Sequence, residues 1–194
     1  TGGAGFIGSK LSLKLIEKGY KVRVLDNLST QIHGNDVHLS PLYLSIKDKV
    51  DFVNGDVRNM DDWKKVIQKQ DAVIHLAAET GTGQSMYEVE RYVNVNIRGT
   101  AILLDLLANN EHQIQKVVVA SSRAIYGEGK YFSDTLGVVF PKERSEYQMS
   151  KAIFDHLCAH SNKNLKSLPT DENSKIHPSS IYGITKHNQE QMIL

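Results

Sequence analysis

The chain opens with glycines at positions 2, 5 and 8, a Gly-x-x-Gly-x-x-Gly spacing that leads directly into an amphipathic segment. Glycine is needed where a backbone turns tightly and where a helix approaches a sheet closely, and a helix N-terminus offers free N–H groups to a pyrophosphate. The spacing therefore predicts a dinucleotide-binding loop, with a glycine-rich turn without a ligand as the alternative. Because such a loop normally follows a buried strand, we expect the first strand to be missing before Thr1.

Short apolar runs alternate with longer amphipathic segments along the rest of the chain. Strands and helices that alternate in this way form right-handed βαβ units. The pattern therefore predicts an α/β fold with a doubly wound parallel sheet of the Rossmann type. Strands are predicted at residues 22–25, 50–53, 72–76 and 117–120, and helices at residues 6–18, 61–70, 86–109 and 182–194,.

Two segments interrupt this alternation. Residues 27–49 are polar and mixed, and residues 127–174 have an uneven composition over a length that exceeds a plain loop,. We interpret the second segment as an insertion near the active site, because it follows the end of a strand. We expect residues 1–194 to form one partial domain that is cut at both ends.

Composition and charge exclude several classes of protein. The chain has 23 Lys and Arg against 22 Asp and Glu, which leaves no basic field to hold nucleic acid. No apolar run approaches the roughly 18 residues of a membrane span, so we expect neither a nucleic acid nor a membrane as partner. The single cysteine, Cys158, is typical of a reducing compartment, and we expect a cytoplasmic protein.

An acidic residue near the glycine loop bears on the choice of dinucleotide. Asp26 follows the predicted strand at 22–25 and lies 18 residues after Gly8. At about 20 residues from the loop, an acidic side chain binds the adenosine ribose hydroxyls and repels a 2′-phosphate. We therefore expect NAD rather than NADP as cofactor. Arg23 would weaken this expectation if its side chain turned outward.

Two other strand ends are candidates for cofactor contacts. Asp56 and Val57 follow the strand at 50–53, where adenine would lie, and residues 76–78 end the next one. Small side chains at such a position let a flat cofactor lie against the backbone. Ordinary turn chemistry is the alternative for both segments.

Two Tyr-x-x-x-Lys pairs are candidates for catalysis. They are Tyr147 with Lys151 and Tyr182 with Lys186. On a helix, residues four apart share a face, so the ammonium can stabilise a neighbouring phenolate. The bare spacing is common and does not choose between the two.

Taken together, the motifs carry a family resemblance. They follow one another in the family's order: Thr1 to Gly8, Leu25 to Leu28, Gly55 to Arg58, His75 to Ala78, Asn96 with Gly99 and Thr100, Ser121 and Ser122 with Tyr126 and Gly127, and Tyr182 to Lys186. Through these motifs the chain resembles the extended short-chain dehydrogenase/reductases. Among these it is most similar to the NAD-dependent nucleotide-sugar epimerases and dehydratases.

The resemblance also favours one of the two tyrosines. In this family the catalytic tyrosine follows the serine motif by a couple of dozen residues, which favours Tyr147. The local pattern favours Tyr182, because Pro178-Ser179-Ser180 precedes it and Glu190 lies four residues after Lys186. An insertion changes distance and leaves a local motif intact, so we expect Tyr182 to be the catalytic residue.

The resemblance implies roles for particular residues. Catalysis would be carried by Ser122, Tyr182 and Lys186. Cofactor contacts would come from Gly2, Gly5, Phe6, Ile7, Gly8, Asp26, Asn27, Asp56, Val57, Leu76, Ala77, Ala78, Asn96, Tyr182 and Lys186. Substrate contacts would come from Thr80, Gln84 and Ser85, although these three are alternatively caps of the helix predicted to start near Met86.

The implied activity is NAD-dependent epimerisation at C4 of a nucleotide-activated sugar through a transient 4-keto sugar. The segments around Ser122 and 169–172 resemble epimerases of dTDP-6-deoxyhexoses such as dTDP-L-rhamnose, and the substrate would be a dTDP- or UDP-sugar. The alternatives are a reductase or dehydratase of the family, and a non-catalytic NAD-binding fragment. A dehydratase would lack its acid and base, because Arg123 and Ala124 stand in their place.

Three further expectations concern partners and completeness. Relatives tend to carry a Cys-x-x-Cys in the insertion, but only Cys158 is present here, so we expect no metal. The resemblance also implies a homodimer, through the long helices by which members of this family pair. Because the substrate domain would follow Lys186, we expect the C-terminal substrate domain to be missing and residues 1–194 to be inactive alone.

Overall fold

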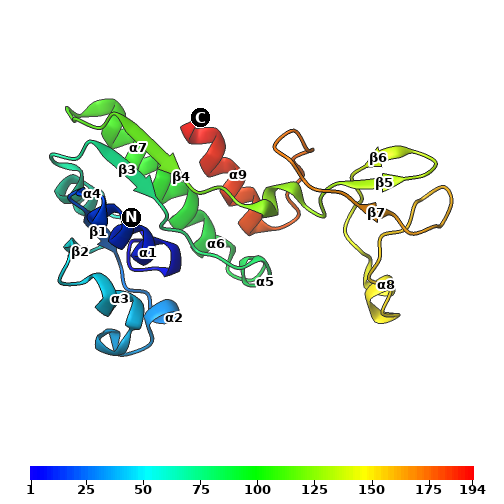
Figure 1. Cartoon of the computed structure of the whole chain (residues 1–194), viewed down its shortest axis with the longest axis horizontal. Coiled ribbons are helices and arrows are strands. Elements are labelled where there is room, and N and C mark those ends of the chain that lie inside the picture. The colour runs from blue at the N-terminus through cyan, green and yellow to red at the C-terminus, as the bar shows by residue number, and fades with distance from the viewer.

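A computed structural model describes residues 1–194. Figure 1 shows a layered α/β body and an arm that projects from it, with α9 returning from the arm to the body. The elements are α1 (Phe6–Glu17), β1 (Arg23–Asp26), α2 (Thr30–His33), η1 (Val37–Leu39), α3 (Pro41–Ile46), β2 (Asp51–Asn54), α4 (Met60–Ile67), β3 (Ala72–His75), α5 (Thr82–Ser85), α6 (Val89–Tyr92), the π-helical segment η2 (Val93–Arg98), α7 (Gly99–Asn109), β4 (Lys116–Val119), η3 (Arg123–Tyr126), β5 (Tyr131–Ser133), β6 (Gly137–Val139), α8 (Glu146–Ser150), β7 (Lys166–Ser167) and α9 (Ile181–Ile193).

The four body strands form two parallel pairs. β1 pairs with β2, and β3 pairs with β4, as the alternation of strands and helices predicts. The pairs are not hydrogen-bonded to each other. Instead, the Gly2 N–H donates to the carbonyl oxygen of Leu25 at 2.9 Å, and the Thr1 amino group donates to that of Ile74 at 2.8 Å. The first residues of the glycine loop therefore link the two strand pairs.

The main core lies where α4 and α7 cover the strands. Trp63 is 1% exposed, and its indole N–H donates to the carbonyl oxygen of Val57 at 2.7 Å. Apolar residues recur at helical spacing in both helices, so each presents one buried face. The cluster comprises Leu25, Val57, Trp63, Val66, Ile67, Val73, Val95, Ile102, Leu103 and Leu106.

The helix predicted at 86–109 is wrong in its start and its regularity. The observed helix begins at Val89, a separate short helix covers Thr82–Ser85, and residues 93–98 are π-helical. Tyr92 lies near the start of this helix, and its hydroxyl donates to the carbonyl oxygens of Thr80 and Gly81 at 2.5 and 3.0 Å. These bonds hold the preceding loop against the helix. The other predicted strands and helices lie within about three residues of the observed ones.

The two segments that interrupt the alternation contain structure of their own. Residues 27–49 hold α2, η1 and α3, and α3 starts with Ser40 as N-cap and Pro41 in its first turn, a helix-start signal. The insertion at 127–174 forms the arm (Figure 1), an antiparallel sheet of order β6-β5-β7 with α8 beside it. Strands of two or three residues are too short for periodicity to reveal them.

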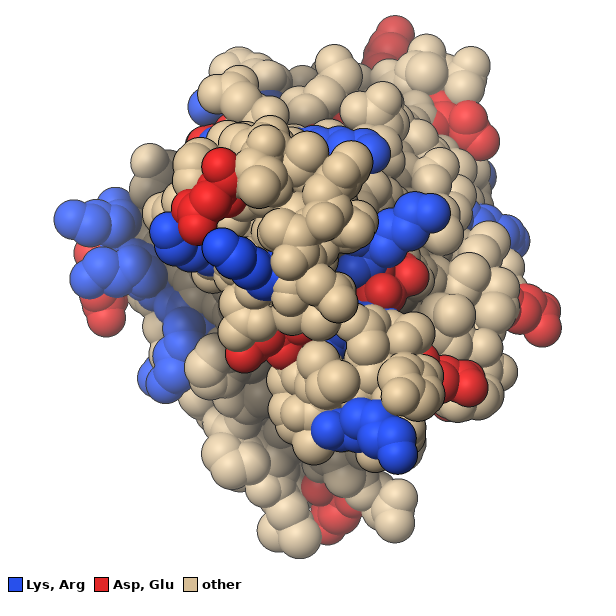
Figure 2. Space-filling view, turned by 90° about the vertical axis from the view of Figure 1, so that its right-hand side faces the viewer, with Lys and Arg blue, Asp and Glu red and all other residues tan.

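The surface carries charges of both signs. Figure 2 shows lysines and arginines interspersed with acidic side chains on the face seen there. No helix in the structure has the length and apolar character needed to cross a membrane.

Candidate active site

The glycine loop lies between the two strand pairs and leads into α1. Gly2 has φ +66°, and a Cβ there would stand 2.6 Å from the backbone nitrogen of Ala77. A Cβ on Gly8 would stand 2.1 Å from the carbonyl oxygen of Gly2. The loop can therefore close against the end of β3 and the start of α1 only with glycine at these positions, as the sequence predicts.

The first turn of α1 presents unpaired amides. Gly5 caps the helix without a side-chain hydrogen bond, and the N–H groups of Phe6, Ile7 and Gly8 form no hydrogen bond. Phe6 and Ile7 are 76% and 62% exposed. Free amides at a helix N-terminus bind anions, so this turn can accept a pyrophosphate.

Asp26 ends β1 beside the glycine loop. Its carboxylate accepts hydrogen bonds from the Ala4 N–H at 2.9 Å and the Leu28 N–H at 3.0 Å. Arg23 points elsewhere, because its guanidinium bonds to Asp51 at 2.6 Å and to the last carbonyl groups of α4. No arginine therefore offsets the Asp26 charge from β1, which removes the objection raised by the sequence.

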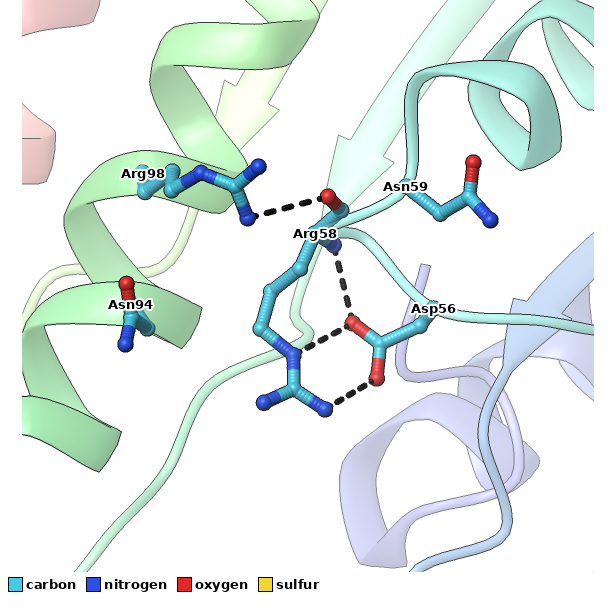
Figure 3. Close-up of a pocket in the computed structure, with 5 residues that line it drawn as sticks. All are labelled: Asp56, Arg58, Asn59, Asn94 and Arg98. Atoms are coloured by element: carbon cyan, nitrogen blue, oxygen red, sulfur yellow. Dashed lines mark hydrogen bonds and ion pairs between the residues drawn. The ribbon is translucent and has the colours of Figure 1, made fainter.

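A small polar pocket opens at the end of β2. Figure 3 shows Arg58 folded onto Asp56, with guanidinium-to-carboxylate distances of 2.9 and 2.7 Å. This hydrogen bonding to Arg58 lowers the pKa of Asp56 to about 2. The amide of Asn27 also donates to Asp56, at 3.2 Å. The pocket has a volume of about 340 Å³ and is lined by Asp56, Arg58, Asn59, Asn94 and Arg98.

Three predicted cofactor residues, Leu76, Ala77 and Ala78, follow β3 and meet the glycine loop. The Leu76 N–H donates to the carbonyl oxygen of Thr1 at 3.2 Å, and the Ala77 N–H donates to the Thr1 hydroxyl at 3.3 Å. The structure therefore brings this segment beside the loop and α1. It also places Asp26, Asn27, Asp56 and Val57 at the carboxyl ends of β1 and β2, the edge of a parallel sheet where ligands bind,.

The alternative that Ser85 caps a helix at Met86 is wrong, because Ser85 lies inside α5. Its side chain is fully buried, and its hydroxyl donates to the carbonyl oxygen of Thr82 at 2.6 Å. Substrate contacts of Thr80, Gln84 and Ser85 stay predictions. Gln84 bonds to Gln31 and Glu88, and the carbonyl oxygen of Thr80 accepts from Tyr92.

Asn96 forms hydrogen bonds between distant segments of the protein. It is fully buried, and its side-chain N–H groups donate to the carbonyl oxygen of Glu79 at 3.1 Å and the Thr185 hydroxyl at 2.9 Å. Its oxygen accepts from the Glu79 N–H at 2.8 Å. Asn96 therefore joins the loop after β3 to α9, and its contact with a cofactor stays a prediction.

The two Tyr-x-x-x-Lys pairs lie in different parts of the molecule. Tyr147 is 69% exposed in the five-residue helix α8 of the arm, and Lys151 follows that helix. Tyr182 lies in the first turn of α9, where Ser180 is the N-cap and its hydroxyl accepts from the Gly183 N–H at 3.0 Å. Lys186 follows one turn later on the same helix.

Helix α9 packs against the segment that carries Ser122. A Cβ on Gly183 would lie 2.7 Å from the carbonyl oxygen of Ala124, so glycine permits this close approach. Ser122 caps η3, and its hydroxyl oxygen accepts from the Ala124 N–H at 3.1 Å. The structure thus brings together the elements that bear Ser122, Tyr182 and Lys186, and leaves Tyr147 in the arm.

Lys186 is buried, which is unusual for lysine. It is 3% exposed, and burial lowers its pKa to about 8. Its ammonium donates to the side-chain oxygen of Gln189 at 2.6 Å. Sequence reasoning missed Gln189 and also Tyr92, whose ring meets that of Tyr182 edge-on with centroids 6.4 Å apart. Helical spacing alone could have indicated that Gln189 shares a face with Lys186.

Parallel strand pairs, a glycine loop at a helix N-terminus and acidic residues at the strand ends define a Rossmann-type dinucleotide-binding domain. Residues 1–168 match the model of the NAD dependent epimerase/dehydratase family, and the chain belongs to that family.

Several relatives are similar over the whole chain. dTDP-L-rhamnose 4-epimerase of Burkholderia thailandensis is 35% identical over 100% of this chain and 51% of its own length. A putative UDP-glucose 4-epimerase of Methanocaldococcus jannaschii is 34% identical over 100% of this chain and 48% of its own length. The solved structure of UDP-glucose 4-epimerase from Brucella ovis in complex with NAD has a TM-score of 0.66 at 29% identity, covering 98% of this chain and 44% of that one. The chain spans about half the length of these relatives.

Proposed function

We propose that this chain carries the NAD-binding and catalytic part of an enzyme that epimerises nucleotide-activated sugars at C4. The observation that carries the proposal is the packing of α9, with Tyr182 and buried Lys186, against the segment of Ser122. The relatives named as 4-epimerases of dTDP-L-rhamnose and UDP-glucose support the same conclusion and the same substrate class, a dTDP- or UDP-sugar. Cys158 forms no disulfide, which supports action in a reducing compartment such as the cytoplasm.

The glycine loop fits NAD. The free amides of Phe6, Ile7 and Gly8 would hold the pyrophosphate, and Asp26 would accept hydrogen bonds from the adenosine ribose,. Asp56 and Val57 would lie beside the adenine. When bound, NAD would supply the acceptor, and then the donor, of the hydride exchanged at sugar C4.

Each catalytic side chain has a role that its surroundings permit. Tyr182, as phenolate, would take the proton of the sugar 4-hydroxyl and give it back after the sugar has turned over. The Lys186 ammonium, one turn away, would stabilise the phenolate electrostatically. Ser122 accepts from the Ala124 N–H and so keeps its own hydroxyl hydrogen, which it would donate to the sugar oxygen at C4.

The test is an NMR assay of the full-length protein with NAD and either dTDP-L-rhamnose or UDP-glucose. We expect the C4 epimer of at least one sugar to accumulate to equilibrium without net reduction of NAD. Stoichiometric formation of NADH without an epimer would contradict the proposal and indicate a dehydrogenase or reductase. Binding of NAD without turnover of either sugar would favour the non-catalytic alternative.

Asp26 should set the preference for NAD over NADP. Replacing Asp26 with Asn removes the charge and keeps an oxygen for the Ala4 N–H. We expect the ratio of NADP⁺ to NAD⁺ dissociation constants to fall by roughly tenfold or more, since a carboxylate close to a 2′-phosphate costs at least ~1.4 kcal/mol. Calorimetric titration of both cofactors measures it. Equal affinities in the unmutated protein would be incompatible with this role of Asp26.

A further inference from the structure

A chain of buried hydrogen bonds runs from Lys186 into the centre of the fold. The Lys186 ammonium donates to the oxygen of Gln189 at 2.6 Å, and the Gln189 amide nitrogen donates to the Thr100 hydroxyl oxygen at 2.8 Å. His75 contacts the same hydroxyl through Nε2 at 3.1 Å, and its Nδ1 lies 2.7 Å from the Thr1 hydroxyl. Gln189, Thr100 and His75 are all fully buried. This series of hydrogen bonds therefore connects α9, α7, β3 and the glycine loop.

Each hydrogen bond in this series has a donor and an acceptor that the others determine. The Thr100 hydroxyl donates to the carbonyl oxygen of Asn96 at 2.7 Å, so its oxygen can only accept from Gln189 and His75. His75 must then carry its proton on Nε2, and Nδ1 accepts from the Thr1 hydroxyl. Burial lowers the pKa of His75 to about 3, which agrees with a neutral ring.

The side-chain oxygen of Gln189 is the hydrogen-bond acceptor for the Lys186 ammonium. A buried ammonium requires hydrogen-bond acceptors, and the hydrogen bond of Lys186 goes to Gln189 alone. The Gln189 amide is itself fixed by Thr100, so its oxygen is held toward the lysine rather than free to rotate. A side chain held at both ends in this way determines where the ammonium lies.

We propose that Gln189 is a positioning residue that holds the Lys186 ammonium in place and anchors it, through Thr100 and His75, to strand β3. This rests on the proposed role of Lys186 beside Tyr182. Gln189 acts through Lys186 and Thr100 and needs no contact with sugar or cofactor of its own.

No other ionisable group on the elements around α9 forms a hydrogen bond with the Lys186 ammonium. Helix α9 packs against α5, α6, η2, α7, η3 and β4, and no charged side chain on these elements bonds to Lys186. Arg91 is paired with Glu79 and Glu88, and Arg98 donates to the carbonyl oxygen of Arg58. The ionisable residues on these elements, on β3 and on α9 itself are His75, Glu90, Arg91, Tyr92, Arg98, Asp105, Lys116, Arg123, Tyr126, Tyr182, His187 and Glu190.

The test follows the titration of Lys186 by NMR in the full chain labelled with ¹³C at lysine Cε, without cofactor or sugar. The Lys186 signal is assigned from its absence in Lys186→Gln. Gln189→Met keeps the size of the side chain and removes the acceptor, so the charged form loses its partner and the Lys186 midpoint should fall by roughly one pH unit. Gln189→Glu replaces the amide oxygen with a carboxylate and should raise the midpoint.

The matched control is Gln191→Met, on the exposed face of the same helix. It should leave the Lys186 midpoint unchanged. Opposite shifts in the two Gln189 variants support the proposal, and a role in packing alone would not produce them. An unchanged midpoint in both variants, or a shift as large in Gln191→Met, would overturn it. If Gln189→Met does not fold, as judged by circular dichroism, the rise in Gln189→Glu decides the question.

Because this titration needs neither NAD nor sugar, its outcome is independent of the proposed activity. In active protein, the same variants should move the alkaline limb of the turnover profile with pH, because turnover is lost as the Lys186 ammonium loses its proton, while Gln191→Met should not. Absence of any turnover in the unmutated protein would count against the proposed function. The Lys186 titration would still test the role of Gln189.

Discussion

Replacing Tyr182 with phenylalanine should lower the turnover number by roughly 10³-fold and leave NAD binding within about threefold, because a positioned acid or base contributes about 10²–10⁴-fold to rate. Phenylalanine keeps the ring that packs edge-on against Tyr92 and removes the hydroxyl that we propose exchanges a proton with the sugar. Turnover is measured by NMR of the epimer, and NAD affinity by calorimetry.

The control for this variant is Tyr147→Phe, the tyrosine of the other Tyr-x-x-x-Lys pair. Tyr147 is 69% exposed in the arm, so its hydroxyl should contribute little and turnover should stay within about twofold. A severe loss in Tyr147→Phe together with normal turnover in Tyr182→Phe would show that spacing from the serine motif, rather than local sequence, identifies the catalytic tyrosine.

Replacing Gly8 with alanine should weaken NAD binding by about 100-fold. The added Cβ would lie 2.1 Å from the carbonyl oxygen of Gly2 and 2.7 Å from the Cα of Gly3, so the loop and α1 must separate. Such overpacking costs about 1–3 kcal/mol, and the shift moves the free amides away from the pyrophosphate they would hold. Calorimetric titration with NAD measures the loss.

Gly83→Ala is the matched control for Gly8→Ala. A Cβ at Gly83 meets nothing within 4 Å, and the residue lies inside the short helix α5, where alanine is favourable. NAD affinity should be unchanged in this variant. Wild-type affinity in Gly8→Ala would mean that the glycine loop does not hold the cofactor as proposed.

The parts of the fold that the sequence predicted correctly depend on local patterns. Glycine spacing predicted the loop, and runs of β-branched residues predicted β1 to β4 within one or two residues. Arg23, which the sequence left undecided, proved to bond to Asp51, a residue 28 positions away. Local patterns thus located the strand ends and could not orient the side chains there.

The features that the sequence missed depend on contacts between distant segments. Gln189 meets Thr100 across 89 positions, and no local pattern pairs them. Asn96 and Ser85 are both fully buried, which no local pattern indicated. The arm contains strands of two and three residues, whose pairing is visible only once the chain has folded.

The fate of the hydrogen at sugar C4 tests the proposed epimerisation most directly. A dTDP- or UDP-sugar deuterated at C4 is incubated with the full-length protein and NAD in ordinary water, and the product is examined by NMR and mass spectrometry. Transfer of a hydride to NAD and back predicts an epimer that retains deuterium at C4, with no accumulation of NADH. An epimer that has lost its deuterium to solvent would contradict the account, because the C4 hydrogen would then have left as a proton.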